Sequence, residues 1–145
     1  MSIKINNRIL STKTVEGIQK VQCIIRKKYL VLTPEEFVRQ QLLKHLIDEL
    51  GYSKNLIQVE KQLTLNGLKK RPDIVCFNNN SAPFLLIECK AINQPINQGT
   101  FNQVAQYNLV WKVPYLAVSN LKTTIIAKVD LESKEFEFVT NWPTV

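Results

Sequence analysis

Two apolar runs separated by a short polar segment constrain the fold of this chain more than any other feature. The runs are Ile74–Phe77 and Phe84–Ile87, and the segment between them is rich in turn-forming residues. Runs that are apolar on both faces are typical of central strands covered on two sides. We therefore expect a hairpin at the centre of a buried sheet, with a loop over residues 78–83.

Charged residues lie at the outer ends of both runs. Asp73 precedes the first run, while Glu88 and Lys90 follow the second. If Asp73 lies opposite Glu88, the register also pairs Phe77 with Phe84. Because side chains alternate between the faces of a strand, Asp73, Glu88 and Lys90 then share one face. Directly opposed residues lie roughly 5 Å apart at Cβ.

This arrangement predicts a metal site suited to phosphodiester cleavage. Two carboxylates so close repel each other unless a cation lies between them, and both are hard oxygen ligands for Mg²⁺ or Mn²⁺. A nearby lysine can stabilise a developing oxyanion or help to activate a metal-bound water. The alternative is a structural ion pair between Lys90 and one of the acids.

A long amphipathic helix is predicted over Pro34–Leu50. Thr33 is the expected N-cap, and Glu36, three residues later, completes a capping box. Gly51 is the expected end of the helix. His45 is the only histidine of the chain and is expected on the helix surface.

The second half of the chain predicts a helix, a strand and a hairpin. Thr100 is expected to cap a helix over Phe101–Trp111. The strand Pro114–Ser119 follows after this helical crossover and is therefore expected to run parallel to the second apolar run. Thr123–Val129 and Glu135–Val139 are expected to form a closing hairpin.

The first third of the chain predicts less regular structure. Residues 1–20 are expected to form an extended arm or a short early element. Short strands are expected at Val21–Ile25 and Tyr29–Leu32, and a further strand at Leu56–Thr64. The chain of 145 residues is expected to form one domain.

The charge of the chain favours a polyanionic partner, since the formal net charge is +7. A dense basic run, Lys69, Lys70 and Arg71, abuts Asp73 and is expected to contact a phosphate backbone. The other basic run, Arg26–Lys28, is equally well explained as a solvated turn.

Several function classes are excluded by what the sequence lacks. No apolar run approaches the roughly 18 residues that a membrane span needs, and the N-terminus is too polar for a secretory signal. No glycine-rich phosphate loop is present, so we expect no nucleotide cofactor in this chain. Cys23, Cys76 and Cys89 lack metal-site spacing and are expected to be buried free thiols in a reducing, cytoplasmic setting.

Beyond these patterns, Pro72-Asp73 followed by Glu88-x-Lys90 resembles the motif of the PD-(D/E)XK nuclease superfamily. More narrowly, four segments in order are similar to the nuclease domain at the N-terminus of type I restriction enzyme R subunits. They are Thr33–Gln40, Leu68–Val75, Leu86–Ala91 and Gln103–Tyr107.

The resemblance implies a restriction-endonuclease-like fold of the mixed α/β (α+β) class, with an αβββαβ core, a mixed central sheet flanked by helices, and extra strands at both ends. It implies a metal-dependent nuclease that hydrolyses phosphodiester bonds of DNA, with Mg²⁺ as cofactor and Mn²⁺ as a substitute. Asp73 and Glu88 would bind the metal, and Glu36 would be a further ligand. That role competes with the capping role of Glu36.

The resemblance also assigns roles beyond the metal ligands. Lys90 would stabilise charge or orient the attacking water. Gln103 and Tyr107, which share a helix face because they are four residues apart, would position the substrate and contact the nucleic acid. The alternative is that Gln103 is a surface amide and Tyr107 a half-buried tyrosine.

Three functions remain open at this point. The first is the nuclease, with DNA as partner and with a homodimer or a separate restriction or defence protein completing double-strand cleavage. The second is a nucleic-acid-binding or assembly module with this fold and little or no cleavage. The third is a small-molecule phosphoesterase, which would need a deep enclosed pocket.

Overall fold

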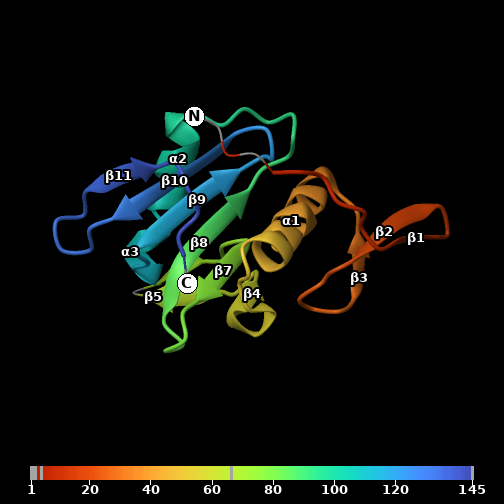
Figure 1. The fold of residues 1–145 in the computed structure, drawn as a ribbon, viewed down its shortest axis with the longest axis horizontal. Coiled ribbons are helices and arrows are strands. Elements are labelled where there is room, and N and C mark those ends of the chain that lie inside the picture. Colours follow the sequence, from red (N-terminus) through yellow and green to blue (C-terminus); the bar gives the residue numbers. More distant parts are fainter. Residues whose placement is uncertain (1–2, 4, 66, 145) are drawn as a thin grey trace.

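A six-stranded mixed sheet forms the centre of the molecule, in the order β11-β10-β9-β8-β7-β4 (Figure 1). The computed structural model describes residues 3, 5–65 and 67–144. The strands of the sheet are β4 (Ile57–Val59), β7 (Ile74–Phe77), β8 (Pro83–Cys89), β9 (Tyr115–Ser119), β10 (Thr124–Val129) and β11 (Phe136–Val139). β8 and β9 are parallel, as predicted, and the other neighbours are antiparallel.

Two smaller sheets and the helices complete the fold, and the predicted mixed α/β class is confirmed. The first small sheet holds β1 (Thr12–Val15), β2 (Ile18–Gln22) and β3 (Tyr29–Val31), and the second holds β5 (Leu63–Leu65) and β6 (Leu68–Lys70). The helical elements are α1 (Pro34–Lys44), the π-helical turn η1 (His45–Glu49), the 3₁₀ turn η2 (Lys54–Leu56), α2 (Gln98–Ala105) and α3 (Asn108–Trp111).

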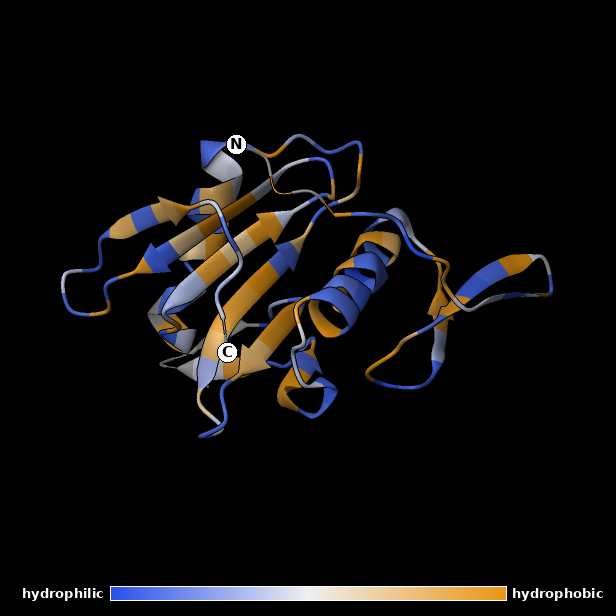
Figure 2. Ribbon diagram, in the orientation of Figure 1, coloured by the Kyte–Doolittle hydropathy of each residue, from blue (hydrophilic) through white to orange (hydrophobic). Residues whose placement is uncertain are grey.

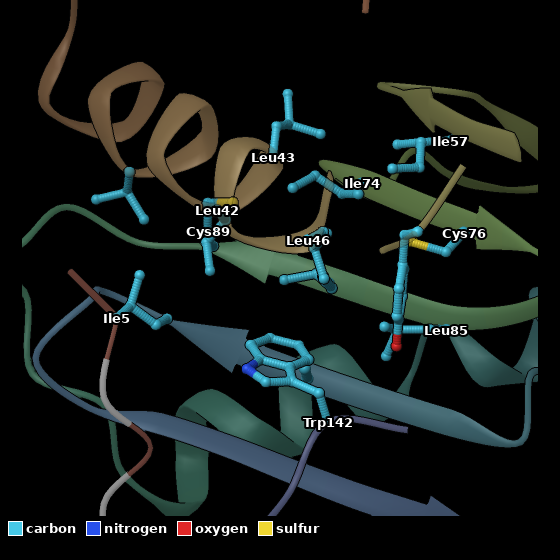
Figure 3. Packing of buried hydrophobic residues seen from close by; sticks show 14 of the residues in the cluster. Ile5, Leu42, Leu43, Leu46, Ile57, Ile74, Cys76, Leu85, Cys89 and Trp142 are labelled. Atoms are coloured by element: carbon cyan, nitrogen blue, oxygen red, sulfur yellow. The ribbon is translucent and has the colours of Figure 1, made fainter. Parts of the chain in front are cut away.

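The central sheet is covered on both faces, as the apolar runs predicted. On one face Leu42 and Leu46 of α1 and η1 pack against Leu85 of β8 (Figure 3). On the other face Leu86 of β8 packs against Phe101 of α2. Figure 2 shows the hydrophobic colour along the central strands. None of the helices in the described residues is long and apolar enough to cross a membrane.

The predicted register of the β7–β8 hairpin is correct over most of its length. Ile74 lies opposite Ile87, and the next two pairs continue in step. The pairing then shifts, so that Phe77 lies opposite Pro83, and the predicted pair of Phe77 with Phe84 is wrong. The loop is one residue shorter than predicted because the Asn78 side chain accepts hydrogen bonds from the backbone of Asn80 and Ala82 and tightens the turn.

α1 begins as predicted, but the capping box is only half formed. Thr33 Oγ1 accepts a hydrogen bond from the Glu36 backbone at 3.0 Å. The Thr33 backbone N–H donates to Val31 instead of to the Glu36 side chain. The predicted surface position of His45 is also wrong, since the ring is buried in the π-helical turn beside Trp142.

The predicted helix Phe101–Trp111 is two helices. α2 starts earlier, because Asn97 is the N-cap and forms a reciprocal capping box with Thr100. At Gln106 and Tyr107 the backbone stays in the right-handed helical region but donates to the carbonyls three residues back, and α3 begins after this tighter turn.

Two of the predicted early strands have different bounds. Residues 12–22 form the hairpin β1–β2, which turns at Glu16 and Gly17, both with positive φ. The strand predicted at Val21–Ile25 therefore ends at Gln22. The predicted strand Leu56–Thr64 is divided into β4 and β5 at Glu60, where φ is +52°.

Candidate active site

The predicted acids meet at one end of the β7–β8 ladder. Ile74 pairs with Ile87, so Asp73 and Glu88 occupy the next positions on the two strands. Asp73 Oδ2 accepts a hydrogen bond from the Cys89 backbone N–H at 2.7 Å, which fixes this carboxylate against β8. Lys90 follows directly, and its backbone N–H donates to Ser119 of β9 at 2.9 Å.

Strand alternation places the acids on the face of the sheet that α2 covers. Glu88 shares the face of Leu86, and Asp73 shares the face of Val75, both of which pack under α2 and α3. A cavity of about 260 Å³ opens at this position. Its lining residues are Glu88, Lys90, Gln103, Val104, Gln106 and Tyr107.

The electrostatics of the pair disfavour two negative charges. Burial raises the pKa of Glu88 well above its usual range, and the hydrogen bond and charge of Asp73 raise it further. The hydrogen bond from Tyr107 and the charge of Lys90 act in the opposite direction. Without a cation, Glu88 is therefore protonated near neutral pH and donates to Asp73.

Tyr107 is part of the same group of polar side chains. Burial raises its pKa, and the hydrogen bond to Glu88 and the charges of both acids raise it further, against the lowering effect of Arg71. The phenol therefore stays a hydrogen-bond donor at physiological pH, directed at the Glu88 carboxyl group.

The donor set fits a hard divalent cation. Asp73 and Glu88 offer carboxylate oxygens, and a dication would relieve the repulsion that now keeps a proton on the pair. Over residues 3, 5–65 and 67–144, no three His, Cys, Asp or Glu side chains are placed so that they could hold one metal ion together. A two-carboxylate site suits Mg²⁺, which usually retains waters and takes substrate phosphate oxygens as further ligands.

The structure does not bring Glu36 into this pair. Its Oε1 accepts from Arg39 Nη2 at 2.7 Å, and its Oε2 accepts from Arg39 Nε at 3.0 Å and from Gln40 Nε2 at 2.9 Å. The carboxylate thus belongs to a buried ion pair on α1. A metal-ligand role for Glu36 stays a prediction and would require this ion pair to open.

Arg39 is the residue beside the site that the sequence did not single out. Its Nη1 lies 3.9 Å from Asp73 Oδ1, and its Nη2 lies 3.4 Å from Glu60 Oε1. Burial alone would lower its pKa, but the hydrogen bond and charge of Glu36, with the charges of Asp73 and Glu60, raise it above the usual value. The Glu36-x-x-Arg39 spacing on one helix face was the available signal.

Of the predicted nucleic-acid contacts, Gln103 and Tyr107 line the cavity, and the charge of Arg71 acts on Tyr107. Gln103 is exposed at the cavity wall, on the last turns of α2. Lys69 and Arg71 are exposed, and the hairpin β5–β6 that leads to them lies against α3. The side chain of Lys70 lies outside the part of the chain that the structure describes.

The cysteine thiols take no part in the site. Cys23, Cys76 and Cys89 are buried free thiols, as predicted. Cys89 turns toward α1, away from Glu88, and burial together with the nearby acids raises its pKa far above the usual value. A thiolate nucleophile at this position is therefore excluded at neutral pH.

Comparison with known proteins identifies the family. No curated protein matches the chain. A solved fragment of a putative HsdR subunit of a type I restriction enzyme from Vibrio vulnificus YJ016 shares the fold, with a TM-score of 0.54, 20% identity and coverage of 78% of this chain. This chain spans only 24% of the length of that fragment. The family model described as type I restriction enzyme R protein N terminus matches residues 34–143. Because this match covers most of the chain, the chain belongs to the family of type I restriction enzyme R protein N-terminal regions.

Proposed function

We propose that this domain is a metal-dependent nuclease that hydrolyses phosphodiester bonds of DNA, with Mg²⁺ as its cofactor and Mn²⁺ as a substitute. One observation carries the proposal: Asp73, just before β7, and Glu88 and Lys90, at the end of β8, meet at the open end of this hairpin beside a cavity. Membership of the R-subunit family supports a nuclease-related role. The motif of the PD-(D/E)XK superfamily agrees with the same assignment.

Asp73 and Glu88 would hold the cation through their carboxylate oxygens. When bound, the cation would polarise a phosphoryl oxygen and lower the pKa of a coordinated water. Glu88 must release its proton to act as a ligand. Tyr107, hydrogen-bonded to Glu88, would keep the carboxyl group in one orientation throughout.

Lys90 and Gln103 would act on the substrate from the other walls of the cavity. The Lys90 ammonium group would stabilise the charge that develops on the phosphoryl oxygens and orient the attacking water. The exposed amide of Gln103 can donate to a phosphate oxygen without adding charge. Lys69, Lys70 and Arg71 would hold the neighbouring backbone phosphates. Cleavage of both strands would need two such sites, so we expect a second copy of the chain or a separate restriction protein to supply the other.

Plasmid cleavage by purified protein tests the proposal. Supercoiled DNA is incubated with Mg²⁺, with Mn²⁺ or with EDTA, using the native chain, Asp73→Asn and Lys90→Ala. We expect metal-dependent nicking or linearisation that falls by at least about 100-fold in both variants, since each removes a charge from the reacting centre.

Matched variants at the far hairpin serve as controls. Asp130→Asn and Lys128→Ala remove the same charges from exposed positions on β10 and its turn, and both are expected to keep the native rate. Cleavage that persists in Asp73→Asn and Lys90→Ala would refute the proposed site. DNA binding without cleavage under any metal condition would favour the binding or assembly module.

A further inference from the structure

The small sheet at the N-terminal end projects from the body beyond α1, at one end of the long axis of the molecule (Figure 1). We call β1, β2 and β3, residues 12–31, the N-terminal arm. It precedes residues 34–143, which the family model matches. Family membership therefore does not account for what this arm does.

The register of the arm separates an inner face from an outer one. Val21 and Leu30 pair on the inner face, where Val21 is fully buried and Leu30 packs against the core beside α1. Lys13 lies directly opposite Lys20, which lies opposite Val31. By alternation the outer face carries Lys13, Val15, Ile18, Lys20, Tyr29 and Val31.

Most of the net positive charge of the chain lies in and beside the arm. Residues 8–31 contain six basic residues and one acidic residue, which accounts for five of the seven net positive charges. Arg8 and Arg26 are paired with Glu49 and Glu60 of the body. The positive charges of this segment that these two ion pairs do not offset are those of its four lysines. Its one acid, Glu16, lies in the β1–β2 turn.

The outer face is electrostatically unfavourable in the free protein. Like charges placed directly opposite each other on neighbouring strands destabilise a sheet. In the described structure neither Lys13 nor Lys20 forms an ion pair with a carboxylate. Lys13 Nζ lies 4.0 Å from the centre of the Tyr29 ring, a contact that does not neutralise its charge. A polyanion would relieve the repulsion.

The shape and the remaining side chains of this face favour DNA as that polyanion. Beyond β3 the β1–β2 hairpin continues as a two-stranded β-ribbon, which has the width that the major groove of duplex DNA accepts. Ile18 and Val31 are 50% and 52% exposed next to Lys20, and can contact sugars and base edges once the phosphates are bound. Lysines interrupt the apolar area of this face, which suits a groove rather than a lipid surface.

The base of the arm is fastened beside the candidate active site. Arg26 Nη2 donates to Glu60 Oε2 at 2.8 Å. The Glu60 backbone N–H in turn donates to the Asp73 carbonyl oxygen at 3.1 Å. A nucleic acid held by the arm is therefore held by an element that is bonded to the segment carrying Asp73.

We propose that the outer face of the N-terminal arm is a second DNA-binding surface, which grips the duplex backbone while the cavity at Asp73 and Glu88 acts on a phosphodiester. The assignment rests on the proposed function, because it supplies that nuclease with its substrate. It predicts that the arm sets affinity and salt dependence while the cavity sets the rate of cleavage.

Fluorescence anisotropy with a labelled duplex of about 30 base pairs in EDTA tests the arm. We expect Lys13→Gln/Lys20→Gln in the full chain to weaken binding about 10-fold at moderate salt. The slope of log K against log salt should fall by about 2, because each lysine neutralises one phosphate and releases its counterion. Glu16→Gln should strengthen binding, because it removes the acid from the tip.

A charge-matched variant separates local contact from net charge. Lys128→Gln/Lys134→Gln removes two lysines from the β10–β11 hairpin at the opposite end of the molecule (Figure 1). By the same counterion argument it is expected to change the affinity less than about 2-fold, because these lysines lie far from the arm. Circular dichroism should show native folding for both double variants, with no loss of thermal stability in the arm variant because a repulsive pair is removed.

The arm proposal is overturned if both double variants lose equal affinity, or if the arm variant binds as the native chain does. Tighter binding of poly-glutamate or of anionic phosphatidylserine vesicles than of the duplex would assign the arm to another partner. If the native chain cleaves in an Asp73-dependent way and the arm variant keeps the native DNA affinity, the arm proposal alone is refuted. A native chain that neither binds nor cleaves DNA refutes both proposals.

Discussion

Single residues in the site are ionisable groups whose charged forms are costly to bury. Glu88 is half-buried and faces Asp73, while Arg39 is buried between carboxylates from two other elements and its own helix. In each case the local electrostatics decide the protonation state, and this state has a measurable effect on stability.

Ionisation of Glu88 should make the domain less stable as pH rises. The folded-state pKa of Glu88 is raised above its unfolded value, so between these two pKa values the folded chain holds a proton that the unfolded chain has lost. Stability therefore falls with pH through this window, by at most about 1.4 kcal/mol per pH unit for one proton. Urea unfolding in EDTA from about pH 5 to about pH 9 measures the slope.

Glu88→Gln should reduce this slope, because the amide does not titrate. Saturating Mg²⁺ should also flatten it in the native chain, since the cation favours the ionised pair and binding releases a proton. The released proton can be measured by calorimetry in two buffers of different ionisation enthalpy. An unchanged slope in Glu88→Gln would show that another group is responsible.

Removal of Arg39 should destabilise the domain strongly. Arg39 is 8% exposed and its partner Glu36 is 6% exposed, so Arg39→Met leaves a buried carboxylate without its counter-charge. We expect a loss of about 3–5 kcal/mol in the free energy of unfolding. Glu36→Gln/Arg39→Met should recover part of this loss, because the neutral amide can keep the hydrogen bond with Gln40.

The more exposed Arg26→Met is the control for this network. The side chains of Arg26 and Glu60 are 25% and 34% exposed, so water screens this ion pair, and we expect a loss of about 1 kcal/mol or less. Equal losses in Arg26→Met and Arg39→Met would contradict the burial argument.

Among the elements, α2 and its break before α3 decide how the site is lined. The helix begins at a reciprocal cap, Asn97 with Thr100, and ends where the backbone hydrogen bonds of Gln106 and Tyr107 change to the carbonyls three residues back. Asn108 then binds both polar groups of the Val113 backbone, at 2.8 and 2.9 Å, and holds the chain after α3. Tyr107, at this junction, is hydrogen-bonded to Glu88.

Loss of the α2 cap should therefore loosen the wall of the cavity. Asn97→Ala removes the acceptor for the Thr100 backbone N–H, which we expect to cost about 1 kcal/mol. Hydrogen exchange should show faster exchange of the first-turn amides of α2. The exposed Asn102→Ala, inside the same helix, should leave these amides protected. Slower exchange in Asn97→Ala would contradict the capping role.

At the scale of the whole molecule, segments near both ends of the chain pack into the core on the α1 face of the sheet. Trp142, near the C-terminus, is buried beside Leu46 and Ile5 in the core on the α1 face (Figure 3). The Tyr52 hydroxyl donates to the Pro143 carbonyl oxygen and fastens the same segment. Ile5 and the C-terminal segment are thus both held in the core on the α1 face of the sheet.

Trp142→Ala should lower global stability rather than loosen only the C-terminus. Removal of a buried indole leaves a cavity between α1 and the sheet and costs about 3–5 kcal/mol. Chemical denaturation followed by circular dichroism should show one cooperative transition at lower urea. The exposed neighbour Asn141→Ala should be neutral. A native midpoint in Trp142→Ala would mean that the segment only rests on the surface.

Much of the fold and part of the site could be predicted because the governing signals are local. The apolar runs specify β7 and β8 as central strands, and strand alternation places Asp73, Glu88 and Lys90 on one face. Turn chemistry was less visible: a hydrogen-bonding Asn78 shortened one loop, and Asn97 rather than Thr100 capped α2. These choices depend on competition between neighbouring side chains, which spacing alone does not resolve.

The sequence by itself determined the central hairpin, its register near Asp73 and the parallel strand β9, because each follows from periodicity and short connections. Only the tertiary structure decided the partners of Glu36, the burial of His45 and the place of Arg39 beside Asp73. These three features depend on which side chains meet when α1 packs on the sheet. A buried charge must form an ion pair with a neighbour in space, and that neighbour can come from anywhere in the sequence.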